Sequence, residues 1–139
     1  MNKDYQIDSA RNIVFTAYSG NTTTEDVIAT INRVLADPEY RPGINAVCDF
    51  TEATAVWSLA DVDRFRVFVS KIKELTPRSR WAVIFPKGKD TTSARIFVAL
   101  HNAFSTNLEV QLFRDRHSAL QWLQESPASS ASAKTSEEN

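Results

Sequence analysis

Short β-rich runs alternate with longer segments of helical periodicity along most of this 139-residue chain. Two β-rich runs come first, and each later run is followed by a stretch with apolar residues at helical spacing. Parallel strands joined through helices produce this alternation, because a crossover between parallel strands needs about a dozen residues or more. The order predicts an α/β fold, β-β-α-β-α-β-α-β-α, with a mostly parallel sheet and an antiparallel hairpin at its N-terminal edge.

The hairpin is expected within the first 18 residues, where Tyr5 and Ile7 alternate before a polar turn and Ile13–Tyr18 resumes the β pattern. Further strands are predicted at Ile44–Phe50, Trp81–Phe85 and Val110–Phe113. Helices are predicted from a cap at Thr22, Thr23 or Thr24 to Leu35, over Leu59–Leu75, over Thr91–Phe104, and from Asp115 through Leu123.

The length fits one domain, which we place at residues 1–124. Residues 125–139 are rich in Ser and Ala and are expected to be disordered, because they cannot bury enough apolar surface to offset the entropy of ordering. The 16 basic and 17 acidic residues nearly cancel, which argues against a dedicated nucleic-acid partner. The N-terminus is polar, and the longest apolar run, Ile96–Leu100, is far shorter than a membrane span. We therefore expect a cytoplasmic protein.

The usual signatures of metal, cofactor and nucleophile sites are missing from the sequence. His101, His117 and Cys48 show no ligand spacing, so the sequence predicts no metal site. The segment Lys87–Thr92 lacks the leading glycine of a phosphate loop and reads as a turn between a strand and a helix, so no cofactor is expected. No catalytic residue is predicted, and an enzyme using strand-end carboxylates such as Asp49 is the least favoured alternative.

Arg95 is a charged residue among the apolar positions of the third predicted helix. A buried arginine needs a carboxylate partner, and Asp49 at the end of a strand is the expected one. The pair is interpreted as structural, with the alternative that Asp49, Thr51 and Arg95 form a ligand or anion pocket where open α/β sheets bind their ligands.

Phe65, Phe68 and Phe97 fall on the second and third predicted helices and are expected mostly in the core. The second helix also carries basic residues beside this apolar face, among them Arg66, Lys71 and Lys73. A solvated face around an ordinary core helix is the favoured reading. The alternative is an apolar or membrane-contacting face that makes weak contact with an anionic membrane.

Several short motifs in a fixed order resemble the SpoIIAA-like family of STAS/SEC14-type domains. They lie between Tyr18 and Leu123 and comprise Thr24-Glu25-Asp26-Val27, Asp37-Pro38 with Pro42-Gly43, Asp49-Phe50-Thr51, Ala94-Arg95-Ile96-Phe97, Phe113-Arg114-Asp115 and Ala119–Leu123. The resemblance implies a superhelix of βα units. In the anti-anti-sigma branch it also implies a phosphorylated serine at the start of a helix, for which Ser58 is the nearest counterpart. That branch carries Asp-Ser-Ser-Gly where this chain has Val56-Trp57-Ser58-Leu59, so a plain helix cap is the favoured role of Ser58.

Two functions remain open from the sequence. The first is a non-catalytic regulatory or binding module that acts through contacts with an unknown protein partner, with a homodimer among the options. The second, implied by the SEC14-type resemblance, is a domain that binds an apolar ligand such as a lipid, or a membrane surface. A fully packed core would favour the first function, whereas an apolar cavity between helices and sheet would favour the second.

Overall fold

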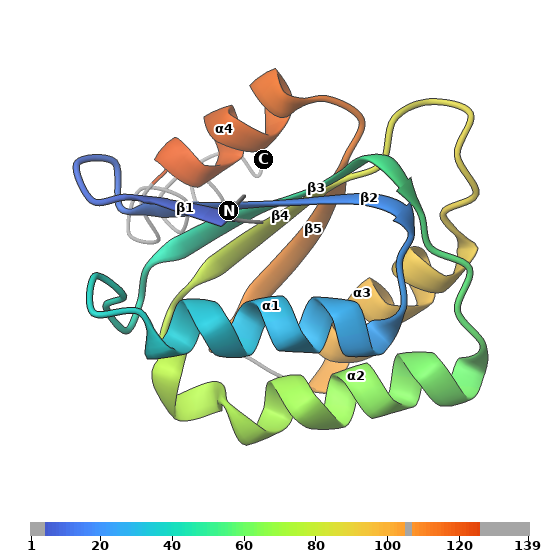
Figure 1. Ribbon diagram of the computed structural model, residues 1–139, viewed down its shortest axis with the longest axis horizontal. Helices are drawn as coiled ribbons and strands as arrows, with labels where there is room; N and C mark the ends of the chain where they lie inside the picture. Colours follow the sequence, from blue (N-terminus) through green and yellow to red (C-terminus); the bar gives the residue numbers. More distant parts are fainter. Residues whose placement is uncertain (1–4, 105–106, 126–139) are drawn as a thin grey trace, which may run out of the picture.

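The computed structural model describes residues 5–104 and 107–125, and within these ranges the predicted order of elements is confirmed (Figure 1). The strands are β1 (Tyr5–Asp8), β2 (Ile13–Asn21), β3 (Asn45–Thr54), β4 (Arg80–Ile84) and β5 (Glu109–Phe113). The helices are α1 (Thr24–Ala36), α2 (Leu59–Lys71), α3 (Thr92–Phe104) and α4 (Arg116–Gln124). Apart from Glu125, the predicted tail lies outside the described residues.

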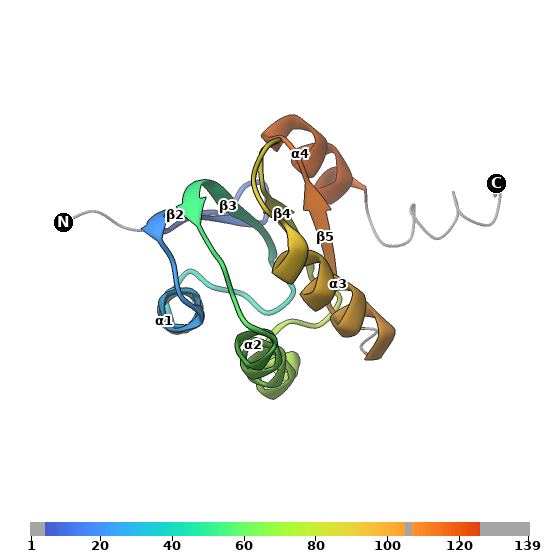
Figure 2. The same cartoon turned by 90° about the vertical axis from the view of Figure 1, so that its right-hand side faces the viewer.

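The sheet has the strand order β1-β2-β3-β4-β5, which is also the order along the chain. β1 pairs with β2 in antiparallel fashion, and the other neighbouring pairs are parallel, as predicted. Each crossover therefore steps to the next strand in the same direction, and right-handed crossovers of this kind place their helices on one face. Accordingly α1, α2 and α3 form a helix layer on one side of the sheet, and α4 covers the other side (Figure 2).

Three elements end at least three residues away from the predicted position, and the first is β2, which continues to Asn21 instead of ending at Tyr18. β3 continues to Thr54 instead of ending at Phe50, because its last residues pair with the end of β2, for example Ala53 with Gly20. α2 ends at Lys71, and a separate 3-10 turn covers Lys73–Leu75. The chain tightens there before a proline, which disfavours helical geometry in the residue that precedes it.

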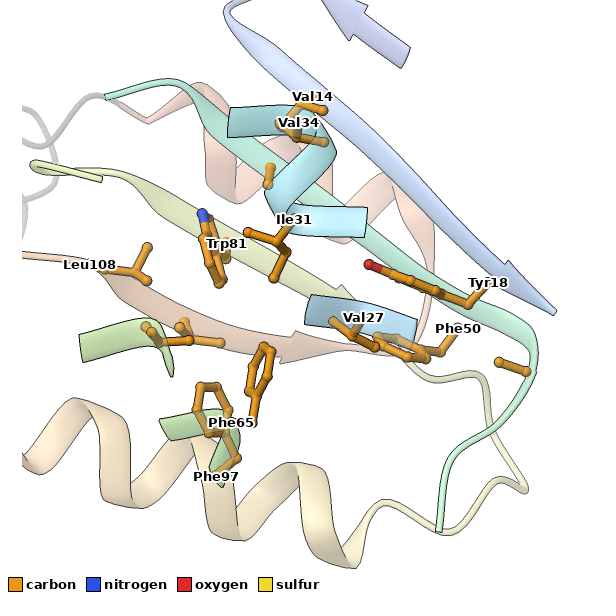
Figure 3. Packing of buried hydrophobic residues seen from close by; sticks show 14 of the residues in the cluster. Val14, Tyr18, Val27, Ile31, Val34, Phe50, Phe65, Trp81, Phe97 and Leu108 are labelled. Atoms are coloured by element: carbon orange, nitrogen blue, oxygen red, sulfur yellow. The ribbon is translucent and has the colours of Figure 1, made fainter. Parts of the chain in front are cut away.

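The main core lies between the helix layer and the sheet (Figure 3). It is built from alternate strand residues and from the inner faces of the helices, and its large buried members include Tyr18, Ile31, Phe50, Phe65, Trp81, Phe85 and Phe97. A smaller apolar cluster under α4 uses the other face of the same strands and contains Ile13, Val47, Ala82, Ile84, Ala119 and Leu123. Neighbouring strand residues thus serve opposite faces, as the pleat requires.

A buried arginine that the sequence analysis did not single out holds α4 against the sheet. Arg80, at the start of β4, is only 3% exposed. Its Nη1 donates to the carbonyl oxygens of Trp122 (2.8 Å) and Glu125 (3.0 Å), and its Nε donates to the Glu109 carboxylate (3.1 Å). Carbonyl groups at a helix C-terminus lack partners within the helix and carry partial negative charge, so a guanidinium satisfies both needs.

Candidate functional site

An apolar cavity of about 50 Å³ lies between the sheet and the helix layer. The sheet contributes Phe50, Trp81, Val83 and Phe85 to its walls, and the helices contribute Val27, Ile31, Phe65, Phe97 and Val98. Phe65 and Phe97 rise from α2 and α3 toward the sheet in Figure 3, opposite Trp81. The lining is almost entirely carbon, so the cavity suits an apolar group.

Rigid aromatic rings shape this cavity. The rings of Tyr18, Phe50 and Phe85 stack in series on the sheet, with centroid distances of 4.7 and 4.8 Å. Opposite them, the rings of Phe65 and Phe97 meet at 5.0 Å in a tilted arrangement. Planar rings leave gaps where the neighbouring side chains are small, and the lining here includes Cys48, Ala55 and Ala94.

A second apolar cavity of about 30 Å³ lies beside the first. Ile31, Cys48 and Trp81 line both cavities and therefore form the partition between them. Burial raises the pKa of the Cys48 thiol to about 11, so this group stays protonated at neutral pH and acts as a small wall residue. The interface between sheet and helix layer is thus incompletely filled over two adjoining spaces.

The loop before α2 borders the first cavity at the carboxyl edge of the sheet, where open α/β folds place their ligands. Within it Trp57 is half-buried, its ring packs 5.6 Å from Phe65, and its indole N–H donates to the Thr22 carbonyl (3.1 Å). On either side of Trp57 and Ser58, the side chains of Val56 and Leu59 are 74% and 69% exposed. The sequence analysis missed Trp57, although an apolar residue directly before a helix cap is a known signal for packing onto the helix that follows.

Ser58 caps α2. Its hydroxyl accepts the Asp61 N–H (3.1 Å), and the Asp61 carboxylate accepts the Ser58 N–H (3.0 Å). These bonds hold the pKa of the Asp61 carboxyl below its usual value. The capping role predicted for Ser58 is therefore present, and its phosphorylation stays a prediction.

The predicted ion pair between Arg95 and Asp49 is wrong. Arg95 is exposed rather than buried, and it lines a groove at the start of α3. Asp49 lines a different groove next to Arg116, and its carboxylate accepts hydrogen bonds from the N–H (2.8 Å) and hydroxyl of Thr51. The two residues separate because side chains alternate along β3. Cys48 and Phe50 face the helix layer, so Asp49 points toward the face that carries α4.

The predicted apolar and basic residues of α2 and α3 fall into two groups. Phe65 and Phe97 are buried and Phe68 is half-buried within the main core, in the role favoured from the sequence. Lys71 and Lys73 are exposed, whereas Arg66 is half-buried and forms an ion pair with Asp63 (2.7 Å). The basic charge beside the apolar face is thus partly neutralised within α2.

The two histidines occupy different environments. His101 is buried, with its Nε2 2.7 Å from the Leu108 carbonyl oxygen and its ring 5.6 Å from that of Phe97. Desolvation lowers the pKa of His101. His117 is exposed on α4. Over residues 5–104 and 107–125, no group of three or more His, Cys, Asp or Glu side chains is placed to hold a metal ion.

The turn between β4 and α3 is held by two side chains of the segment Lys87–Thr92. The Asp90 carboxylate accepts the Thr92 N–H (2.9 Å), and the Lys89 ammonium donates to the Ala53 carbonyl (2.9 Å). These contacts fit the strand-to-helix turn predicted from the sequence. None of the helices in the described ranges combines the length and apolarity needed to cross a bilayer.

One solved structure aligns with most of this fold. It is an uncharacterized protein from the DUF3478 family, with a SpoIIAA-like fold, from Shewanella loihica PV-4, and the match covers 80% of this chain and 83% of that chain with a TM-score of 0.51. The chain adopts a SpoIIAA-like fold. The sequence identity to that structure is 23%, so the comparison establishes the SpoIIAA-like fold and nothing more specific. No family model matches the chain, and no curated protein sequence does.

Proposed function

We propose that this SpoIIAA-like domain is a non-catalytic module that binds an apolar ligand. The observation that carries the proposal is the apolar cavity of about 50 Å³ between the sheet and the helix layer. Most interiors are packed with few voids larger than a water molecule. A carbon-lined space next to the carboxyl edge of the sheet therefore favours ligand binding over a purely structural core.

The size of the cavity limits what it accepts. It exceeds the roughly 10–15 Å³ that a water molecule needs, yet it is smaller than the roughly 150 Å³ apolar cavity that admits benzene. The small volume thus favours an alkyl group over a ring system. Burying four methylene groups contributes about 3 kcal/mol, so an alkyl chain alone would bind only in the millimolar range or more weakly.

A second candidate function is regulation through protein contacts, which the exposed side chains of Val56 and Leu59 favour. Large apolar groups that are mostly exposed and close together often mark interaction surfaces. They flank Ser58, so the predicted phosphorylation would change the charge of this surface. Ligand binding remains the first candidate, because a function through protein contacts alone does not require a cavity.

Titration of the protein with 1-octanol, followed by methyl NMR, tests the proposal. The valine methyl groups that line the cavity, including those of Val83 and Val98, are expected to shift progressively as 1-octanol is added up to its solubility limit, because millimolar binding leaves the cavity only partly occupied. Cys48→Leu fills part of the cavity and should remove these shifts, whereas Val67→Leu on the exposed face of α2 should leave them unchanged. Shifts that are equal in the wild type and in Cys48→Leu would place the octanol elsewhere and contradict the proposal.

A further inference from the structure

A groove of about 470 Å³ lies between the start of α3 and the start of α4, at the carboxyl ends of β4 and β5. Arg95 from α3 and Arg114 from the end of β5 both line it. Both arginines are exposed, and within the described part of the chain neither forms an ion pair. Two free guanidinium groups from separate elements therefore face one groove.

The acidic groups near the groove are already engaged. Asp115 lines it as well, but its carboxylate accepts the Ser118 N–H (2.8 Å) at the start of α4. The Asp90 carboxylate occupies the corresponding place at the start of α3. Both carboxylates stay ionised, because these hydrogen bonds lower the pKa of Asp115 and of Asp90, and the nearby charge of Arg95 lowers the pKa of Asp90 further. The lining of the groove, with Arg95, Arg114 and Asp115, therefore carries one net positive charge, and its attraction for anions comes from the two arginines.

The groove and the apolar cavity share part of their walls. Phe85 and Leu112 line both spaces. The first turns of α3 also border both spaces, since Arg95 lines the groove while Ala94 and Val98 line the cavity. Phe85 and Leu112 therefore form the wall between the two spaces, and a single elongated molecule that displaces these side chains would meet carbon on one side and guanidinium groups on the other.

We infer that the ligand is an anionic amphiphile, a molecule with one alkyl chain and a phosphate or carboxylate head. The chain occupies the apolar cavity, and the head lies in the groove between Arg95 and Arg114. This inference rests on the proposed function. The cavity alone is too small to enclose a ligand, whereas the groove falls in the range of about 300–1,000 Å³ that is typical of ligand sites. Charge-assisted hydrogen bonds between the anionic head and the arginines also add to the small binding free energy of a short buried alkyl chain.

Calorimetry with three probes tests the inference, namely octyl phosphate as a monomer, 1-octanol as the tail alone and inorganic phosphate as the head alone. Octyl phosphate is expected to bind at least about tenfold more tightly than either part, because it uses both spaces. Arg95→Gln and Arg114→Gln should each weaken octyl phosphate about tenfold and leave 1-octanol unchanged. Arg41→Gln replaces an exposed arginine of the loop before β3 and is the matched control, with no effect expected on any probe.

A cavity variant completes the experiment. Cys48→Leu should weaken both octyl phosphate and 1-octanol, with thermal melting used to show that each variant is folded. If 1-octanol binds while the arginine variants bind octyl phosphate normally, the amphiphile inference fails and the proposed function survives. If neither compound binds the wild type, both fail together. Arginine-dependent binding that ignores Cys48→Leu, or sedimentation with phosphatidylglycerol vesicles without binding of monomeric octyl phosphate, would also overturn the inference, because neither involves the cavity.

Discussion

The helices that lie on the two faces of the sheet in Figure 2 are held by different kinds of contact. On one face, Arg80 reaches from β4 to two carbonyl oxygens at the C-terminal end of α4, and its guanidinium lies 4.9 Å from the centre of the Trp122 ring. On the other face, the polar ties of α3 to the sheet are at its far end, where His101 contacts Leu108 and Asn102 bonds to Val110 (2.8 and 3.3 Å). Its first turn is tied to the loop before α2 by one long hydrogen bond, from the Trp57 N–H to the Ser93 hydroxyl (3.4 Å). Between those ties and the carboxyl edge, the helix layer meets the sheet through apolar contacts around two cavities.

The difference agrees with the proposed function, in which the face that carries α4 is the scaffold and the helix layer is the proposed binding surface. Hydrogen bonds are directional, so the bonds from Arg80 to the C-terminal end of α4 fix the position of this helix on the sheet. Apolar contacts are not directional, and side chains around a cavity can shift without leaving polar groups unpaired. The helix layer can therefore accommodate a ligand near the first turns of α3, while the other face keeps the sheet in place.

The largest expected effect on stability comes from replacing Arg80. Arg80→Met should lower the free energy of unfolding by about 3 kcal/mol, because it removes a buried guanidinium that donates to the partly buried carbonyls of Trp122 and Glu125. Urea denaturation measures the change. Arg41→Met, at an exposed arginine, should stay within about 0.5 kcal/mol of the wild type. Equal effects of the two substitutions would show that Arg80 does not clamp α4.

A larger side chain should lower the free energy of unfolding on one face of the sheet and raise it on the other. Ala119 is fully buried between α4 and the sheet, so Ala119→Leu should destabilise the protein by about 2 kcal/mol through overpacking. Cys48 lines both cavities, so Cys48→Leu should stabilise it by about 1 kcal/mol by filling empty space. Thermal and urea unfolding give both values. Destabilisation of the same size by both substitutions would mean that the two faces are packed alike.

The smallest expected effect is a pH dependence confined to the helix layer. Desolvation lowers the pKa of His101 in the folded protein by more than the hydrogen bond to the Leu108 carbonyl raises it, and the nearby charge of Arg66 also lowers it. The unfolded chain, with a histidine pKa of about 6.5, therefore binds the proton first, and stability falls as the pH drops below about 6.5. Between about pH 7.5 and about pH 5.5, the wild type should lose more stability than His101→Gln. Hydrogen exchange should accelerate in α3 over the same range, and an equal acceleration in α4 would contradict this assignment.

Local patterns in the sequence were sufficient to predict the elements and their order. Hydrophobic periodicity marks each helix, and the buried run Trp81–Phe85 marks a central strand, because both patterns depend only on neighbouring residues. The cap at Ser58 was predictable for the same reason, since both partners of the capping box lie within four residues.

The candidate site was harder to predict, because it depends on contacts between distant segments. Whether Asp49 meets Arg95 depends on which face of β3 receives the helix layer, and a shift of one residue reverses that face. The cavity arises where the small side chains of Cys48 and Ala94 come together among aromatic rings, although they are far apart in the chain. Arg80 looked like an ordinary charge before a strand, since its carbonyl partners come more than 40 residues later.

The identity between strand order and chain order has a consequence for how the molecule forms during synthesis. Each new strand pairs with the one made just before it, so no strand has to wait for a partner that is synthesised later. A nascent chain that leaves the ribosome can therefore extend the sheet one βα unit at a time, always at its newest edge. The exception is α4, which lies on the opposite face of the sheet. The Arg80 guanidinium can therefore bond to the carbonyl oxygens of Trp122 and Glu125 only after α4 has been synthesised. Completion of the scaffold is thus deferred until α4 has been synthesised.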